Sequence, residues 1–464
     1  MARAGYRFRP RLRRFKPACA VLAVLSAAGS AAAQQTIAPE SLHYLGAFRL
    51  PGGEDRPLTF AYGGNAMTYN PDGDPTGPAD GFPGSLFVTG HDRMAYGELP
   101  DGDQVAEITI PVPVRASTPA ALGEAGFVQP FRDIAAGWFA GLDEIPRVAM
   151  QYLNAPPLGA RIHLGWGQHL QDDEASHALF SPGLSAPAMQ GPWSIADVTP
   201  YATTGYMLEI PADWAAAHTQ GRVIGTGRYR DGGWSGMGPA LFAYAPWTAD
   251  GTLAAAGARL PATTLLHYRS STETERIEGA LAGYQHPDEW EGAAWLTTTD
   301  GRAAVLFAGT KAVGSRYWYG FVNPAGAERS CVAGDFVGEF PVCRLADGSE
   351  CPAAELVECT GHNDFRGWWS TRFAAQLILY DPADLAAVAD GTAAPWQPQP
   401  YAAVSIDDVL FLDPPPWDVE TLGAGPQRRL RIGDAAYDRE RQILYVLELF
   451  ADGAKPVVHV WRID

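Results

Sequence analysis

Three acidic side chains are the first candidates for chemistry in this sequence. Asp92 follows a strand-like run and a turn, whereas Glu291 and Asp434 stand at the start of short runs rich in glycine and alanine. Two or three carboxylates around one pocket suit glycoside hydrolysis, in which one acid protonates the leaving oxygen and another acts as nucleophile or base. We expect these three to be the catalytic groups. The alternative is structural, because acids at strand ends also bind turn amides.

Side chains of the kinds that bind sugars form a second set. Aromatic faces stack on sugar rings, although tryptophan also fills the space between packed strands. His91 and Asp92 can also be interpreted as a structural pair that orders neighbouring loops. The candidates for substrate binding are His91, Arg230, Trp234, Trp290, Lys311 and His362.

Several well-known catalytic motifs do not occur in the chain. The sequence contains no G-x-S-x-G nucleophile elbow, no H-E-x-x-H zinc motif and no phosphate-binding P-loop. The nearest approach to an elbow is the segment 233–237, Gly-Trp-Ser-Gly-Met, which lacks the final glycine. Acids and histidines are therefore the reagents that the chain offers.

A recurrent pattern indicates the elements that position these residues. Short runs rich in glycine and small residues precede a turn and a second, apolar strand, which is typical of inner strands that crowd around an axis. These runs begin at Gly64, Gly238, Gly292 and Gly433, the copy at Gly238 being partial. Third strands are expected at Val105–Pro111, Tyr206–Pro211 and Gln376–Pro382, each closed by proline.

Repeats on this scale predict an all-β fold, a single β-propeller with about five blades, or six. Tyr44–Leu50 can supply the outer strand of the last blade, whose third strand is Val457–Ile463, so that the two chain ends close the ring. A jelly roll or sandwich is the alternative architecture. Short helices are expected only at Pro211–His218 and Pro382–Ala389.

Propeller topology predicts where the candidates lie. Starts of inner strands and returns after second strands share one face of the ring. Residues that are distant in sequence therefore meet at one channel mouth. The residues expected there are Asn65, His91, Asp92, Glu291, Lys311 and Asp434.

Two resemblances to known families follow from these residues. The architecture resembles the five-bladed propeller glycoside hydrolases, which implies acid catalysis without a cofactor. The run Glu291-Gly-Ala-Ala-Trp295 resembles the E-G-P-x-W opening of the gluconolactonase (senescence-marker) propellers, with alanine in place of proline. That likeness implies an oxygen-rich Ca²⁺ site at Asn65, Glu291 and Asp434, and hydrolysis of a lactone or phosphate ester. A non-catalytic propeller that binds glycan or protein is the third hypothesis.

The N-terminal segment predicts export. Residues 1–33 combine seven cations and no acid, a short apolar stretch and Ala31-Ala-Ala33, which is typical of a cleaved signal peptide. The expected location is therefore secreted or periplasmic, with residues 34–464 as the propeller domain. Cleavage lowers Lys plus Arg from 34 to 27 against 52 acids, so the formal charge changes from −18 to −25. Such an acidic surface repels nucleic acid, and no later stretch is apolar enough to span a membrane.

Four cysteines lie together in a segment rich in glycine, proline and polar residues. They predict a loop excursion at about 323–370 that is held by two disulfides. A zinc site formed by the cysteines is the alternative, but the spacings contain no C-x-x-C pair. The cysteines are Cys331, Cys343, Cys351 and Cys359.

The ligand of the protein is expected to be a small molecule or polysaccharide, and the sequence leaves the oligomeric state open.

Overall fold

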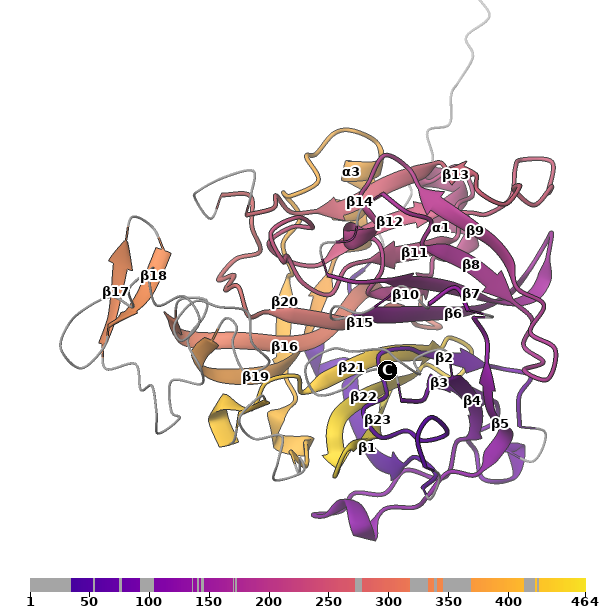
Figure 1. Ribbon diagram of the computed structural model, residues 1–464, viewed down its shortest axis with the longest axis horizontal. Helices are drawn as coiled ribbons and strands as arrows, with labels where there is room; N and C mark the ends of the chain where they lie inside the picture. The colour runs from indigo at the N-terminus through magenta and orange to yellow at the C-terminus, as the bar shows by residue number, and fades with distance from the viewer. Residues whose placement is uncertain are drawn as a thin grey trace, which may run out of the picture. The chain divides into compact units, whose positions relative to one another are not determined.

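The protein is an all-β propeller of five blades (Figure 1). The computed structural model describes residues 35–52, 55–74, 77–91, 104–135, 137–139, 142, 146–169, 171, 173–271, 278–317, 333–337, 340–344, 369–412, 422–423 and 425–464. Strands in this part of the chain form five sheets of four or five strands and one separate two-stranded hairpin. The predicted fold class is confirmed, with five blades and not six.

The first three blades each run from an inner strand outward. Blade 1 contains β2 (Met67–Asn70), β3 (Ser85–Thr89), β4 (Gln104–Thr109) and β5 (Phe127–Asp133). Blade 2 contains β6 (Arg147–Ala155), β7 (Gly159–Gly167), β8 (His177–Phe180), β9 (Gln190–Ile195) and β13 (Arg259–Leu260). Blade 3 contains β10 (Tyr206–Glu209), β11 (Ile224–Gly227), β12 (Ala240–Tyr244) and β14 (Ala262–His267).

The last two blades complete the ring. Blade 4 contains β15 (Glu289–Thr297), β16 (Ala303–Tyr317), β19 (Trp369–Tyr380) and β20 (Ala402–Ser405). Blade 5 contains β21 (Ile432–Asp438), β22 (Ile443–Asp452), β23 (Lys455–Ile463) and, from the other end of the chain, β1 (Leu42–Arg49). The expected helices are also present, as α1 (Ala212–His218) and α3 (Pro382–Ala389).

The five inner strands form a closed circle. Each contacts the next in the order β2, β6, β10, β15 and β21, and β21 contacts β2 (Figure 1). Small residues make this crowding feasible, as the sequence indicates. A Cβ atom at Gly292 would lie 2.6 Å from the backbone nitrogen of Ala435 on the neighbouring strand. The glycine is thus required by the close approach of β15 to β21.

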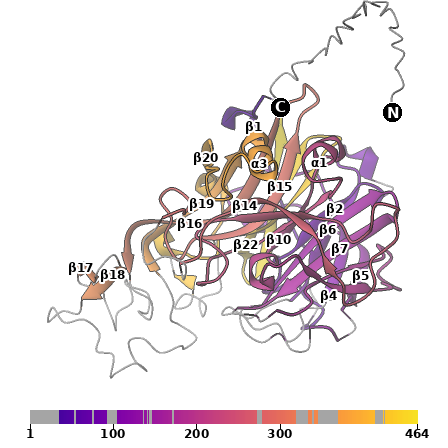
Figure 2. The same cartoon turned by 90° about the horizontal axis from the view of Figure 1, so that it is seen from above.

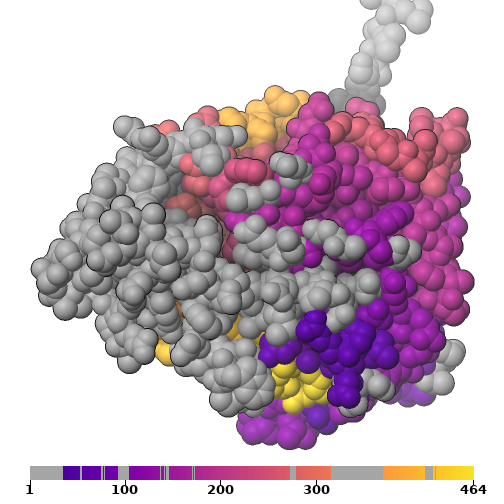
Figure 3. Space-filling model, in the orientation of Figure 1, coloured from indigo at the N-terminus to yellow at the C-terminus, as the bar shows by residue number. Residues whose placement is uncertain are grey.

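Blade 5 confirms the predicted closure of the ring by the chain ends. β1 pairs antiparallel with β23, with Ala47 opposite His459. A chain of hydrogen bonds supports this pairing: Tyr44 Oη lies 2.9 Å from Nδ1 of His459, whose Nε2 lies 2.8 Å from a Glu448 carboxylate oxygen. Figure 3 shows N-terminal residues, in indigo, next to C-terminal residues, in yellow.

The predicted strand order is wrong in blade 3 and incomplete in blade 2. Tyr206–Glu209 is the inner strand of blade 3, and the strand after Gly238 is the third, not the inner. Gly238 has φ +152°, and a Cβ atom there would lie 2.5 Å from the Tyr268 ring. That glycine therefore relieves packing within its own blade, away from the axis. The inner strand of blade 2, β6, lacks the glycine pattern altogether.

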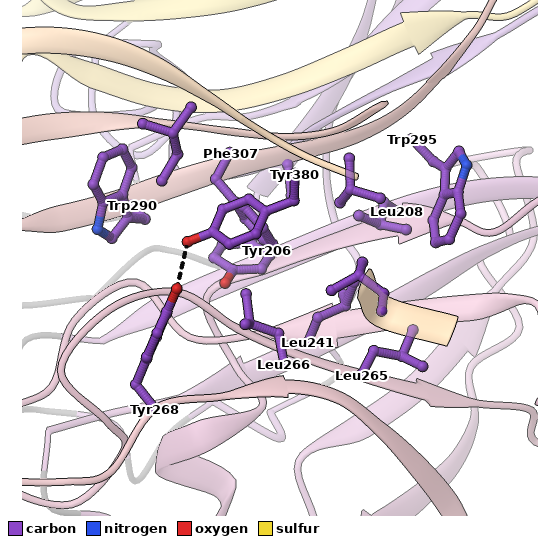
Figure 4. Packing of buried hydrophobic residues seen from close by; sticks show 14 of the residues in the cluster. Tyr206, Leu208, Leu241, Leu265, Leu266, Tyr268, Trp290, Trp295, Phe307 and Tyr380 are labelled. Carbon is purple, nitrogen blue, oxygen red and sulfur yellow. Dashed lines mark hydrogen bonds between the residues drawn. The ribbon is translucent and has the colours of Figure 1, made fainter. Parts of the chain in front are cut away.

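The hydrophobic core lies mainly between blades. Blades 3 and 4 pack through Tyr206, Leu241, Trp290, Phe307 and Tyr380, all of which are buried (Figure 4). Within this contact the Tyr268 and Tyr380 hydroxyls lie 2.8 Å apart (Figure 4). Each blade thereby depends on its neighbours for burial, as in other repeat architectures.

Several predictions concern positions outside the described residues. These are the signal peptide, Asp92, His362, Cys331, Cys351 and Cys359. Cys343 belongs to the hairpin of β17 (Ala333–Val337) and β18 (Phe340–Arg344), which contacts β16 of blade 4 (Figure 2). Export, the disulfides and the zinc alternative therefore stay predictions. No helix among the described residues is long and apolar enough to cross a membrane.

We expect Gly292→Ala to destabilise the protein, because the added methyl group would meet the backbone of β21. Overpacking of this kind lowers the free energy of unfolding by about 1–3 kcal/mol. Gly123→Ala is the control, since the nearest atom to its Cβ position is 3.9 Å away. Urea unfolding of both variants tests this, and equal midpoints would contradict the close approach of β15 and β21.

Candidate functional site

Glu291 and Asp434 both lie at irregularities in neighbouring inner strands. In blade 4, Trp290 pairs with Gly309 and Gly292 with Ala308, so Glu291 is the extra residue of a β-bulge. In blade 5, the register shifts between Ile432 and Ala435, a stretch that includes Asp434. Bulges are frequent next to active sites, where they redirect a side chain. The two acids thus lie at the same end of adjacent strands.

Glu291 forms a buried ion pair that crosses the channel mouth. Nε of Arg147 donates to one carboxylate oxygen at 3.0 Å, and Nη2 donates to the other at 3.1 Å. Arg147 begins β6, which is not a ring neighbour of β15 because β10 lies between them. Both side chains are at most 2% exposed. The pair holds Glu291 as a carboxylate and joins blades 2 and 4.

Asp434 is buried in a different environment. Its two oxygens accept hydrogen bonds at 2.8 Å from the backbone N–H groups of Met67 and Ala435. Burial, with a smaller effect from the Glu291 charge, nevertheless raises the pKa of Asp434 well above its ordinary value. Glu291 and Asp434 therefore lie in contrasting environments, one beside a guanidinium group and one among backbone N–H groups.

Asn65 adjoins Asp434 at this mouth. It lies between Gly64, whose carbonyl oxygen is 3.3 Å from the backbone nitrogen of Asp434, and Ala66 and Met67 at the start of β2. The side chain is fully buried. Asn65, Glu291 and Asp434 therefore lie at the starts of three inner strands that follow one another in the ring.

Three other candidates have contacts that favour structural roles. Lys311 Nζ donates to Asp288 at 2.9 Å and to two backbone carbonyl oxygens at 2.8 Å. Nδ1 of His91 lies 2.9 Å from the Ala61 carbonyl oxygen, and the residue is 2% exposed. Trp290 packs in the core between blades 3 and 4 (Figure 4).

Arg230 and Trp234 gather with two residues at the edge of blades 2 and 3. Nη2 of Arg230 lies 3.1 Å from Nδ1 of His169, and the Tyr201 hydroxyl lies 2.7 Å from the same nitrogen. Trp234 meets the Tyr201 ring edge-on with centroids 6.3 Å apart, and it is 41% exposed. An exposed indole beside polar side chains is suited to stacking on a sugar ring.

The channel itself is narrow below the acids. A cavity there is lined by residues of all five inner strands, among them Gln151, Glu209, Ala293 and Ala435. The volume of this cavity that the centre of a water molecule can occupy is about 20 Å³, which is room for about one water. A sugar ring does not fit this space.

The residues of the Ca²⁺ alternative do not fit a cation as they stand. Arg147 takes both oxygens of Glu291, and the raised pKa of Asp434, caused by its burial, favours the uncharged acid. In the part of the chain that the structure describes, no group of three or more His, Cys, Asp or Glu side chains could hold a metal ion. We therefore derive no step through a metal.

Comparisons with known proteins do not add a family to this picture. No protein-family model matches the chain, and no curated protein matches it with significant similarity.

Arg147 is the site residue that sequence reasoning missed. The run that begins at Arg147 is rich in strand-forming residues and predicts a strand. The partner of Arg147, however, is 144 positions away. No local pattern connects the two residues. A lone arginine before an apolar strand more commonly marks a solvated strand end.

We predict strong coupling between Arg147 and Glu291. Arg147→Met leaves the buried carboxylate of Glu291 without its guanidinium and should lower the free energy of unfolding by about 3–5 kcal/mol. The double variant Arg147→Met/Glu291→Met removes both charges and should recover most of that loss. A double-mutant cycle from urea unfolding measures this, and additive effects of the two single substitutions would show that the ion pair is absent.

We also predict a pH dependence from Asp434. Because burial raises its folded-state pKa above the unfolded value of about 3.9, its stabilising contribution is complete below about pH 4. That contribution is lost as the pH rises through the folded-state pKa. The side chain at position 434 in the variant Asp434→Asn cannot ionise. The free energy of unfolding of this variant should therefore increase relative to that of the wild type as the pH rises from 4 to 8. A difference that stays constant over this range would contradict a raised pKa.

Proposed function

We propose that this propeller is an exported hydrolase that cleaves a glycosidic bond of a carbohydrate. The observation that carries the proposal is the pair of carboxylates on neighbouring inner strands, Glu291 held ionised by Arg147 and Asp434 with a pKa raised by its burial. Glycoside hydrolysis requires one protonated and one ionised carboxyl group. Asp434 is the proposed general acid, and Glu291 is the proposed nucleophile or base, with Asp92 as a further acid.

Each chemical role follows from its environment. The protonated Asp434 would donate its proton to the glycosidic oxygen as the bond to the leaving sugar breaks. Glu291 would stabilise positive charge that develops on the sugar ring, or activate a water. Arg147 acts as a positioning residue, because its bidentate contact fixes the orientation and ionised state of Glu291. Trp234 and Arg230 would hold the sugar at the edge of the mouth.

A non-catalytic, glycan-binding propeller is the second candidate. The observation in its favour is that both carboxylates are at most 1% exposed and accept hydrogen bonds through both of their oxygens. A catalytic carboxyl group has to reach its substrate, whereas a binding surface requires only the exposed residues near Trp234.

We expect purified mature protein to release reducing sugar from a polysaccharide panel, with unchanged rates in EDTA. Asp434→Asn should abolish turnover, because an amide is similar in shape to the protonated acid but cannot donate the catalytic proton. Glu209→Gln, near the cavity below the acids, is the control and should keep full activity.

The same experiment separates the alternatives. Turnover of lactones or phosphate esters that EDTA abolishes would favour the metal-dependent hydrolase. Binding of glycans without turnover would favour the binding propeller. Full activity of Asp434→Asn would refute the assignment of the general acid.

A further inference from the structure

Three guanidinium groups gather around one aromatic ring at the channel mouth. The Cζ atoms of Arg147 and Arg228 each lie 4.2 Å from the centroid of the Tyr229 ring, and that of Arg230 lies 5.4 Å away. Arg228 also stacks on Tyr201, with its Cζ 3.2 Å from the ring centroid. This group of cations, the arginine cluster, stands out in a chain whose formal charge is −18.

Two members of the arginine cluster have acidic partners. Arg147 forms the bidentate pair with Glu291, and Nη1 of Arg230 lies 3.7 Å from a carboxylate oxygen of Glu289. The second oxygen of Glu289 is buried and has no hydrogen-bond partner among the described residues. The cluster therefore holds three cations against two carboxylates.

Arg228 has no carboxylate partner among the residues that the structure describes. Its Nη1 donates to the Thr204 hydroxyl at 3.3 Å, whereas Nε and Nη2 are buried without a hydrogen-bond partner. The residue is 1% exposed. Burial lowers the pKa of Arg228, but arginine remains charged in proteins. A buried cation of this kind requires an anion, since aromatic faces offset only part of the desolvation cost.

Tyr201 links Arg228 to residues at the surface of the protein. Tyr201, which covers its guanidinium, is in turn flanked by the exposed Trp234 and by the partly exposed His169. Arg230 reaches the same histidine at 3.1 Å. A planar, aromatic surface therefore adjoins a cationic group that is short of one negative charge. A sugar that carries a carboxylate matches both features, because guanidinium forks bind carboxylates through paired hydrogen bonds.

We propose that the ligand is an acidic sugar, whose carboxylate binds Arg228 and Arg230 while its ring stacks on Trp234. This inference rests on the proposed function only in taking the ligand to be a carbohydrate, and it requires no turnover. It assigns the substrate class as uronic acid-containing glycans.

Binding measurements test the proposal directly. Calorimetric titration of the mature protein with oligogalacturonate should show binding that is about 10- to 100-fold tighter than with the neutral oligogalactoside of equal length, the range for hydrogen bonds to a charged group. Arg228→Met should lose that preference. Arg228→Lys should keep part of it, because it retains the charge without the fork. Arg439→Met, which alters a cation near the cavity below the acids, should bind as the wild type does.

A melting experiment distinguishes recognition from a purely structural role. Arg228→Met should not lower the Tm of the unliganded protein, because it removes a buried charge that lacks a counter-ion. A lower Tm with unchanged affinity for oligogalacturonate would overturn the proposal.

Three further outcomes would also overturn it. These are equal binding of acidic and neutral oligosaccharides, binding by Arg228→Met that matches the wild type, and stabilisation by acetate or chloride equal to that by the oligomer. Failure of the proposed function looks different, since oligogalacturonate would then bind without being cleaved.

Discussion

The ion pair between Arg147 and Glu291 is the interaction on which the candidate site depends. It joins the first residue of β6 to a bulged residue of β15 across the start of β10. Removal of either partner deprives a buried charge of its counter-ion, which is far more costly than loss of an exposed ion pair. The contact fixes the orientation of Glu291, whose charge adds a smaller effect to the burial that raises the pKa of Asp434.

The bulges explain how a tightly packed propeller can carry polar groups at its axis. Regular inner strands place small residues such as Ala293 and Ala435 along the channel, where they leave little more than the space of a water molecule. An extra residue at the start of the strand turns Glu291 out of that register. The axis is therefore packed along the strands and polar at their beginnings.

The sequence predicts the architecture better than it predicts the site. Runs at Gly64, Gly292 and Gly433 identify three inner strands because their small residues are needed where strands approach closely. The run at Gly238 misleads, since the same residue type also relieves a local contact with Tyr268. The topological rule brings Asn65, Glu291 and Asp434 to one mouth, whereas the partner of Arg147 lies 144 positions away and no local pattern indicates it.

The closure of blade 5 has a consequence for the order of folding. The hydrogen bond between Tyr44 and His459 joins positions 415 residues apart, so β1 finds its partner only after almost the whole chain has been synthesised. Contacts of such long range slow the final stage of folding. Until then β1 presents an unpaired edge, the kind of surface on which aggregation begins. Blade 5 therefore closes only when both β1 and β23 are present, and a chain that lacks either strand has an unpaired strand edge in that blade.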